Sequence, residues 1–280
     1  MTVSIAHLGP KGTFSDFAAT IYAESQTDNE TQLRAYSTIN QVIKAVEKGE
    51  ADFCVVPVEN SIGGGVTDTL DTLWEQDQLQ IQQAFTLPVQ HAFISRASSL
   101  DQVDRVYSHP QALTQCRDWL ADNLPEVVLI PAGSTTEALP KIKEEIRSAV
   151  IASSWGARIY DLPILAHPIN DYADNYTRFW VLGKATATQG AYTSLAFSLP
   201  TNESGALLKP LQLFSALNIN MSRIESRPTK RLLGEYVFFV DIEADASQPT
   251  TKTALELLKM HTASLQYLGS YDLMEIKETL

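Results

Sequence analysis

Short β-rich runs alternate with amphipathic helical patterns over the first two thirds of the chain. Residues 3–8 (VSIAHL) and 53–57 (FCVVP) are apolar runs of strand length, whereas residues 38–49 repeat apolar side chains every three or four positions, the period of one helix face. Strands that alternate with helices are typical of βαβ units, in which helices cover a largely parallel sheet. The pattern therefore predicts an α/β fold for this part of the chain.

Further elements follow the same alternation. Strands are expected at residues 89–94, 106–107, 127–130 and 149–151. Helices are expected from about residue 13, from the glycines at 63–65 to about residue 74, and at residues 110–120 and 135–147. Pro140 conflicts with the last of these helices, because proline lacks the backbone N–H that a helix interior requires. We expect a kink or a later start there.

A change in composition separates a second pattern from the first. Residues 184–191 (KATATQGA) are small and polar with no apolar period, which predicts a linker. After it the pattern reads strand 193–199, helix 205–217, strands 221–224 and 236–242, helix 250–263 and a strand near Leu273. The order βαββαβ is that of a ferredoxin-like domain. At 280 residues the chain is long enough for two domains, and we expect them at residues 1–183 and 192–280.

The composition indicates which partners the protein can bind and in which compartment it resides. The chain has 33 acidic and 21 basic residues, so its net charge of -12 disfavours nucleic acid, which is bound mainly by lysine and arginine patches. Any anionic ligand must be held by a local site. Cys54 and Cys116 lie in apolar or helical surroundings, and we expect two reduced, buried thiols. The N-terminus lacks a secretory pattern and no window has the length of a membrane span, which indicates a cytoplasmic protein without membrane partners.

Polar side chains gather where the first strands end. The stretch GPKGTFSDFAA follows a strand and opens a helix, so its free backbone N–H groups can receive an anion. Capping of a plain turn by Thr13 or Ser15 explains the stretch equally well. In VENSIGGGVTDTL, Glu59, Asn60 and Ser61 end a buried strand, and glycines follow. Ligands of open α/β sheets sit at such strand ends, although Asn and Ser before Gly are also common in turns.

The remaining candidates for chemistry are hydroxyl and amide groups. In SHPQALTQC, Ser108 can cap a helix that presents Gln111 and Gln115 on one face, and taken alone capping is the simpler explanation. The histidines never take metal-ligand spacing with one another or with cysteine, which argues against a catalytic metal. The chain has no Gly-x-Ser-x-Gly elbow, so covalent acyl transfer has little support. Neutral donors with Arg178 and Lys11 form a set suited to a small polyanion.

Three interpretations compete for the segment DNYTRFWVLG, where Asn175, Thr177 and Arg178 crowd the start of an apolar run. Asn-Tyr-Thr fits the N-x-[ST] pattern of a glycosylation acceptor, the segment can be an ordinary strand entry, or the three side chains can face a ligand. A cytoplasmic location argues against the sugar. The spacing leaves the other two interpretations open.

Four segments in this order resemble prephenate dehydratase: GPKGTFSDFAA, PVENSIGGGVTDTLDTL, SHPQALTQC and NYTRFWVLG. GALLKPLQLFSALNINMSRIESRP and LGEYVFFVDIEA resemble the ACT domain that these enzymes carry. The resemblance implies an α/β catalytic domain with two lobes, similar to a solute-binding protein, at about residues 1–85 with 165–183 and at about residues 86–164. It implies that the second domain, a ferredoxin-like βαββαβ unit, is a regulatory ACT domain. The implied reaction converts prephenate to phenylpyruvate, CO₂ and water in phenylalanine biosynthesis without a cofactor.

The resemblance also implies roles for residues of the cleft. Thr177 matches the threonine of the family's TRF motif and is the candidate for protonating, or donating a hydrogen bond to, the departing hydroxyl. Arg178 is expected to hold a substrate carboxylate, with a salt bridge to Asp174 or Glu59 as the alternative. Phe179 is expected to pack in the site. The other residues expected to line the cleft are Thr13, Asn60, Ser61, Ser108 and Gln115, with Glu59 supporting Asn60.

In the second domain the resemblance implies feedback by phenylalanine, bound between two ACT domains of a homodimer or homotetramer. The residues expected to bind it are Gly205, Ala206, Leu207, Asn220, Glu225 and Ser226. Trp155 departs from the small residues expected in its region, and either reshapes a wall of the cleft or fills a lobe interface. Two alternatives remain: arogenate dehydratase on the same fold, and a non-catalytic amino-acid sensor. The intact Thr177-Arg178-Phe179 triplet speaks against the sensor, which has no need of a donor at a leaving group.

Overall fold

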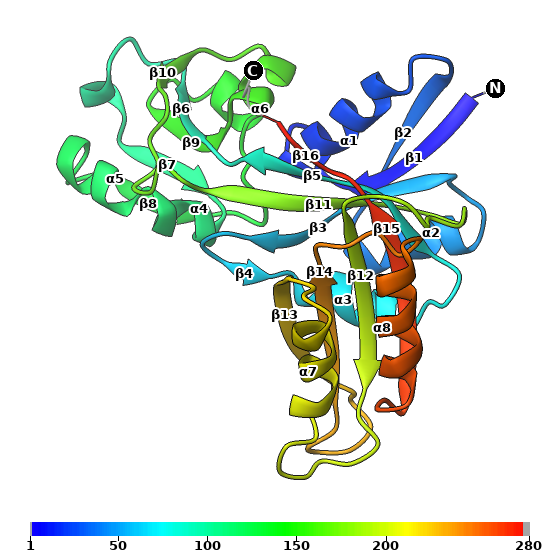
Figure 1. Ribbon diagram of the computed structural model, residues 1–280. Helices are drawn as coiled ribbons and strands as arrows, with labels where there is room; N and C mark the ends of the chain where they lie inside the picture. The colour runs from blue at the N-terminus through cyan, green and yellow to red at the C-terminus, as the bar shows by residue number, and fades with distance from the viewer. Residues whose placement is uncertain (1, 277–280) are drawn as a thin grey trace.

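Three β-sheets organise the chain in the computed structural model, which describes residues 2–276 (Figure 1). Two sheets lie side by side in the upper part of the view, and the third forms a limb below them. The predicted end of the second domain at residue 280 lies outside the described residues. Along the described part of the chain, no helix combines the length and the apolar character that crossing a membrane requires.

The first sheet has seven strands in the order β16-β5-β11-β3-β1-β2, with β4 paired to β3. Helix α1 covers one face, and α2 and α3 cover the other. Thr13 and Thr38 each accept a backbone N–H of the following turn, which explains where α1 and α2 begin. The bounds are β1 (Thr2–Leu8), α1 (Phe14–Ser25), β2 (Glu30–Tyr36), α2 (Ile39–Glu47), β3 (Phe53–Asn60), β4 (Gly64–Gly65), α3 (Thr67–Trp74), β5 (Gln80–Pro88), β11 (Tyr176–Gly183) and β16 (Leu273–Glu275).

The second sheet has five strands in the order β10-β6-β9-β7-β8. The chain passes from the first sheet to the second after β5 and returns after β10. Because β11 returns antiparallel to both β3 and β5, the first sheet is mixed, and the expectation of a largely parallel sheet was wrong. The bounds are β6 (His91–Ser95), η1 (Leu100–Gln102), β7 (Arg105–Ser108), α4 (Pro110–Gln115), α5 (Arg117–Asn123), β8 (Val128–Pro131), η2 (Lys141–Lys143), β9 (Ser148–Ser153), α6 (Ser154–Tyr160) and β10 (Ile164–Ala166).

Several elements differ from the expectations. Residues 135–147 form turns and the single 3₁₀ turn η2, not an α-helix, in keeping with the helix-breaking Pro140. The helix expected at 110–120 is divided into α4 and α5 at Cys116. The apolar pattern also fails to predict β2 and β5, because β2 is a largely polar edge strand and β5 begins with Gln80-Ile81-Gln82-Gln83.

The third sheet has the order β13-β14-β12-β15, and all its neighbouring strands are antiparallel. The βαββαβ order is as predicted, but its last strand is β15. Leu273 instead belongs to β16, which runs parallel to β5 and returns the chain to the first sheet (Figure 1). The bounds are β12 (Tyr192–Ser198), α7 (Leu208–Ala216), β13 (Met221–Pro228), β14 (Tyr236–Ile242), α8 (Pro249–Lys259) and β15 (Ser264–Tyr271).

The third sheet is buried on both faces. One face packs on α7 and α8 around Leu195, Phe197 and Phe214. The opposite face packs on the first sheet, where Phe239 of β14 and Trp180 of β11 belong to a single core that also holds α2 and α3. The first and third sheets are therefore joined by a continuous apolar contact.

The interface between the two lobes contains Trp155 of α6. Its indole Nε1 donates to Asp16 Oδ2 of α1 over 2.8 Å, and its ring lies 5.2 Å from that of Phe17 between centroids. Trp155 thus fills the lobe interface, the second of the two alternatives considered for it.

Trp180→Ala should lower the free energy of unfolding by about 3–5 kcal/mol, because it opens a cavity at the junction of the first and third sheets. Urea unfolding followed by circular dichroism measures the change. Tyr172→Ala is the control, since the side chain of Tyr172 is 63% exposed, and it should stay within about 0.5 kcal/mol of the wild type. A loss for Trp180→Ala as small as that of the control would contradict the buried junction.

Candidate active site

A cavity of about 240 Å³ lies between the first two sheets, near the points where the chain crosses between them. A larger hollow of about 520 Å³ is formed mostly by loops at residues 199–202 and 229–235 of the limb. Hydroxyl, amide and imidazole groups from both sheets converge in the smaller cavity, and we therefore take it as the candidate active site. Its lining residues are Phe14, Ser15, Pro57, Asn60, Val66, Val89, His91, His109, Gln111, Ala112, Gln115, Thr135, Thr177 and Phe179.

Strands β3 and β11 bring the predicted donor into this cavity. Thr177 of β11 stands opposite Asn60, the last residue of β3. Phe179 lies two positions further along β11 and so shares the face of Thr177. The ring of Phe179 stacks on Phe85 with centroids 5.8 Å apart. Phe179 therefore packs, as expected, and forms part of the cavity wall.

The orientation of the Asn60 side chain is fixed by the loop that follows β3. Its Oδ1 accepts the backbone N–H groups of Ile62 (3.1 Å) and Gly63 (2.8 Å). The amide nitrogen must then point the other way, and Nδ2 donates to Thr177 Oγ1 over 3.0 Å and to Asn175 Oδ1 over 2.8 Å. Since Oγ1 of Thr177 accepts this bond, the hydroxyl proton remains free to donate elsewhere.

The fixed direction of these hydrogen bonds continues into the second sheet. Asn175 Nδ2 donates to Gln115 Oε1 over 3.2 Å, and His91 Nε2 lies 3.0 Å from the same oxygen. An amide oxygen only accepts, so the proton of His91 sits on Nε2, and its Nδ1 is a buried acceptor without a hydrogen-bond partner among residues 2–276. Burial lowers the pKa of His91, which keeps the ring neutral.

His91 was not among the predicted cleft residues, and Asn175 was one of three side chains for which facing a ligand was an open interpretation. Asn175 is 1% exposed and hydrogen-bonded on both sides of its amide, so the folded chain does not offer it as a glycosylation acceptor. His91 carried no signal beyond its position at the start of an apolar strand. His109 and Gln111 also line the cavity, and both lie in the SHPQ stretch that was singled out for Ser108 and Gln115.

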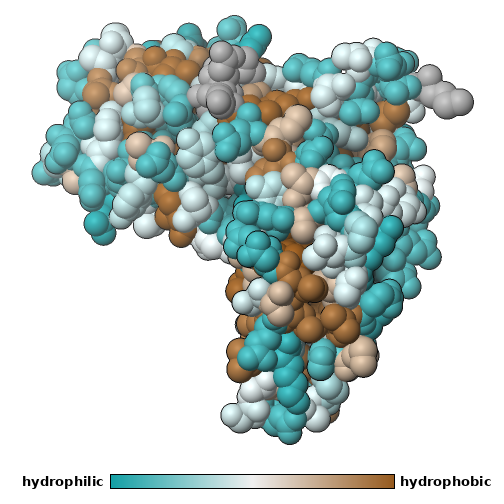
Figure 2. Space-filling view, in the orientation of Figure 1, coloured by the Kyte–Doolittle hydropathy of each residue, from teal (hydrophilic) through white to brown (hydrophobic). Residues whose placement is uncertain are grey.

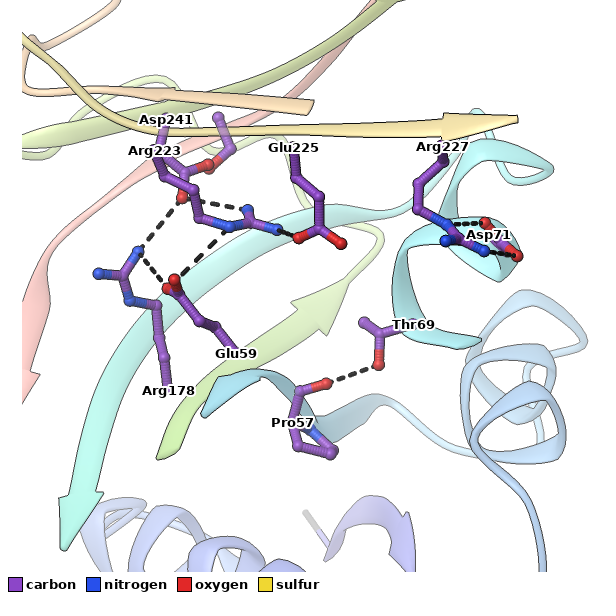
Figure 3. Close-up of polar contacts among 10 residues, drawn as sticks. Pro57, Glu59, Thr69, Asp71, Arg178, Arg223, Glu225, Arg227 and Asp241 are labelled. Carbon is purple, nitrogen blue, oxygen red and sulfur yellow. Dashed lines mark hydrogen bonds and ion pairs between the residues drawn. The ribbon is translucent and has the colours of Figure 1, made fainter. Parts of the chain in front are cut away.

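Arg178 does not share the cavity with Thr177. Consecutive residues of a strand point to opposite faces, and Arg178 points toward the third sheet (Figure 3). Its Nη1 lies 3.2 Å from Asp241 Oδ2 and 3.7 Å from Glu59 Oε2. The expectation that Arg178 holds a substrate carboxylate beside Thr177 is corrected by this placement, and the ion pair with Glu59 is the alternative that was open. Glu59 likewise faces away from the cavity and does not support the Asn60 side chain.

Thr13, Ser61 and Ser108 form hydrogen bonds with the backbone and are not among the lining residues of the cavity. Thr13 caps α1, and Ser61 hydrogen-bonds the backbone just before and at the start of β11. Ser108 Oγ donates to the carbonyl of Ile151 over 2.6 Å, while His109 is the N-cap of α4. The interpretation of Ser108 as a cap was therefore wrong, and its role in the cleft stays a prediction.

The residues expected to bind an effector are divided between the two faces of the third sheet. Glu225 of β13 faces the first sheet, where its Oε2 lies 3.1 Å from Arg223 Nη2. Leu207 packs in the core between the sheet and its helices. Gly205, with φ of 81°, makes a left-handed turn before α7 that favours glycine. The remaining members are the half-buried Ala206 and the exposed Asn220 and Ser226.

The two thiols are free and buried, as predicted. Burial raises the pKa of Cys116 to about 12 and raises that of Cys54 as well. Neither thiol is therefore an active nucleophile at neutral pH. Between residues 2 and 276, no three His, Cys, Asp or Glu side chains are grouped so that they could hold a metal ion.

The burial of histidine should make the protein less stable in mild acid. Burial lowers the pKa of His7, His91 and His167 below the ordinary value of about 6.5. Below that value the unfolded chain takes up protons that the native state refuses, so stability is present at neutral pH and is lost as the pH falls.

We therefore expect the free energy of unfolding to decrease between pH 7 and pH 5, and to decrease less steeply in His91→Gln. The difference in slope should be at most about 1.4 kcal/mol per pH unit, the limit for one proton. Urea unfolding at a series of pH values measures both slopes. The same slope in the variant and the wild type would show that the pKa of His91 is the same in the native and unfolded states.

Known proteins share both parts of this architecture. A family model for prephenate dehydratase matches residues 5–187, and a model for the ACT domain matches residues 193–256. A bifunctional chorismate mutase/prephenate dehydratase of Aquifex aeolicus is 41% identical over 271 residues, which cover 96% of this chain and 73% of the relative. A prephenate dehydratase of Lactococcus lactis is 35% identical over 285 residues, which cover 99% of this chain and 100% of the relative.

The solved structure of a prephenate dehydratase from Arthrobacter aurescens in complex with L-Phe has the same fold. It matches with a TM-score of 0.86 and 32% identity, covering 97% of this chain and 90% of that one. The predicted fold class is confirmed: a two-lobed catalytic unit followed by a ferredoxin-like ACT domain. From the family model over most of its length and from these relatives, we conclude that the chain belongs to the prephenate dehydratase family.

Proposed function

We propose that the cavity between the first two sheets carries the prephenate dehydratase activity of this chain. In this reaction the bond to the ring hydroxyl and the bond to the ring carboxylate both break, so that the prephenate dianion and one proton give phenylpyruvate, CO₂ and water. The electron pair of the broken C–C bond enters the ring, and aromatisation drives the reaction. The enzyme has to orient a dianion and to place a proton donor at the leaving oxygen.

The direction of the hydrogen bond from Asn60 to Thr177 is the observation that carries the proposal. Because Asn60 Nδ2 donates to Thr177 Oγ1 over 3.0 Å, the threonine proton is available to a ligand in the cavity. An aliphatic hydroxyl is a weak acid, so Thr177 acts by holding a donor in place while the hydroxyl leaves. A preorganised donor of this kind is typically worth about 2.7–4 kcal/mol.

Asn175, Gln115 and His91 continue the chain of hydrogen bonds behind Thr177. Each amide in it is satisfied by a neighbour, so none can rotate without leaving a buried polar group unpaired. Asn60 and its neighbours therefore act as positioning residues for the donor. Gln115 was expected to bind the substrate, and we propose that it also positions the donor through Asn175.

The carboxylates of the substrate meet neutral donors in this arrangement. The described lining of the cavity contains no Lys or Arg, since Arg178 faces the third sheet. Phe14 and Ser15 line the wall at the first turn of α1, where backbone N–H groups lack intrahelical partners and favour an anion. His109 and Gln111 add side-chain donors from the second lobe.

The lining also favours prephenate over arogenate. Arogenate carries an ammonium group where prephenate has a ketone, and an ammonium in a buried site needs a carboxylate partner. The described residues that line the cavity include no Asp or Glu. A non-catalytic sensor is disfavoured because it would not need a donor aimed at a leaving group.

Regulation is the second part of the proposal. Phenylalanine acts as feedback effector and binds where Gly205, Ala206, Leu207, Asn220, Glu225 and Ser226 of one copy meet a second copy. Two features support this: the related Arthrobacter aurescens enzyme was solved with L-Phe, and β13 is an edge strand that a second copy can reach. Figure 2 shows hydrophobic residues gathered on the limb, and exposed ones in this part of the chain include Leu208 and Met260. These exposed apolar side chains support at least a homodimer.

The catalytic and regulatory domains follow one another along the chain. The catalytic domain comprises residues 1–183, with lobes at about 1–85 with 165–183 and at about 86–164. Residues 184–191 are the linker, and residues 192–280 form the regulatory domain in a cytoplasmic enzyme. The three-sheet arrangement supports this division, although β16 returns from the regulatory domain to the first sheet.

Thr177→Ala should lower kcat roughly a hundredfold or more, whereas Thr177→Ser should keep much of it, because serine retains the donor. Phenylpyruvate formation from prephenate measures the rates. Tyr176→Phe is the control on the neighbouring, 44% exposed residue and should leave kcat unchanged. Wild-type activity in Thr177→Ala would show that Thr177 has no part in the mechanism. If the wild type turned over neither prephenate nor arogenate, the proposed dehydratase activity would be refuted.

Gly205→Leu should weaken phenylalanine inhibition while turnover without phenylalanine stays largely intact. A side chain at φ of 81° strains the turn that presents the start of α7, and this turn is remote from the cavity lining. Inhibition curves with increasing phenylalanine test the effect. An unchanged curve in a folded variant would refute this placement of the effector site.

A further inference from the structure

Two residue pairs of β3 and β11 stand back to back across the first sheet. Thr177 pairs with Asn60 and Arg178 with Glu59 in the strand register. The first pair is hydrogen-bonded over 3.0 Å and faces the cavity. The second is an ion pair of 3.7 Å between Nη1 and Oε2 that faces the third sheet. Because Arg178 and Thr177 are consecutive residues of β11, a shift of the strand at Arg178 also shifts Thr177.

Arg178 is connected to the third sheet through Asp241 of β14. Oδ2 of Asp241 lies 3.2 Å from Arg178 Nη1 and 3.3 Å from Arg223 Nη1, so one carboxylate oxygen serves both guanidinium groups (Figure 3). Arg223 in turn holds Glu225 over 3.1 Å between Nη2 and Oε2. A continuous series of ion pairs thus runs from Glu225 in β13 to Arg178 in β11.

The centre of this series is buried. Asp241 is 1% exposed and Arg223 is 8% exposed. The other oxygen of Asp241 accepts the hydroxyl of Ser194 over 2.6 Å, and the guanidinium of Arg223 lies 5.6 Å from the ring centroid of Trp180. Charges held in so little water are sensitive to the loss of a partner, because solvent does not replace it.

Glu225 also touches the loop that orients Asn60. A Cβ built on Gly65 would overlap the carboxylate of Glu225, so glycine is the residue that permits this approach. Gly65 follows the same glycine loop in which Ile62 and Gly63 donate to Asn60 Oδ1. Glu225 therefore contacts the catalytic domain both through the ion pairs and through this loop.

We propose that Asp241 is a positioning residue that couples the ACT domain to the Asn60–Thr177 pair. A ligand ammonium that draws Glu225 away from Arg223 leaves Arg223 to compete more strongly with Arg178 for Asp241. Arg178 is then released, β11 shifts against β3, and the donor at Thr177 loses its alignment. The identity of the ligand as an amino acid rests on the proposed function, whereas the link from Asp241 to Thr177 does not.

Asp241→Asn tests the link, because asparagine keeps an acceptor for Ser194 and removes the charge shared by the two arginines. Asp71→Asn is the matched control. Asp71 of α3 forms the other group of ion pairs across this interface, with Arg227 at 2.8 Å and Lys230 at 2.8 Å, and does not contact β3 or β11 through them.

Three measurements are made on the full-length wild type and both variants: amide hydrogen exchange of segments 58–63 and 174–179, dehydratase kinetics, and phenylalanine binding with inhibition. In Asp241→Asn we expect faster exchange in both segments and a several-fold lower kcat at unchanged KM. Phenylalanine should still bind, and its half-inhibitory concentration should rise by about tenfold or more. Asp71→Asn should match the wild type in all three.

Wild-type exchange and kcat in Asp241→Asn would overturn the proposal, and so would equal changes in Asp71→Asn. If phenylalanine did not inhibit the wild type, phenylalanine would be refuted as the effector. The amide hydrogen exchange and the kcat of Asp241→Asn would then still decide the role of Asp241. Asp241→Asn that fails to bind phenylalanine at all would assign the residue to the effector site and contradict a coupling role.

Discussion

The alternation of side chains along β11 is the constraint on which the rest of the site depends. Because consecutive residues of a strand point to opposite faces, the triplet Thr177-Arg178-Phe179 cannot present all three side chains to one ligand. Thr177 and Phe179 face the cavity between the lobes, and Arg178 faces the ACT domain. A single strand thereby lines the cavity with one face and contacts the third sheet with the other.

The hydrogen bonds behind Thr177 show how a weak donor is given a direction. Two backbone N–H groups after β3 fix the amide of Asn60, and every later bond through Asn175 and Gln115 to His91 follows from that choice. No cation lines the described cavity, so orientation of neutral dipoles replaces charge. This suits a reaction whose driving force lies in the substrate and whose protein needs to supply only alignment.

Sequence patterns predicted the parts of the fold that periodicity controls. The βαββαβ order, a cap at Thr13 and the buried thiols followed from local residue types. The helix expected at residues 135–147, with a kink or a later start at Pro140, was wrong, because the segment forms turns and the short 3₁₀ turn η2 around this proline. The strand near Leu273 was assigned to the wrong sheet, since a short apolar run does not say which neighbour it will pair with.

The site was predictable only in part, for a similar reason. Motif order identified Thr177, Asn60 and Gln115, all of which line the cavity or orient its donor. It could not reveal the partner of Arg178, because Asp241 is 63 residues away in another domain. His91 was missed and the role of Asn175 was undecided, because both roles come from long-range hydrogen bonds, which leave no periodic trace in the sequence.

We infer that the two faces of β11 have separate tasks. The most direct test is a high-resolution crystal structure with an unreactive prephenate analogue bound between the lobes. We expect the ring hydroxyl of the analogue within hydrogen-bonding distance of Thr177 Oγ1, with Arg178 still paired to Asp241. An analogue carboxylate held by the Arg178 guanidinium, with Asp241 released, would contradict the account.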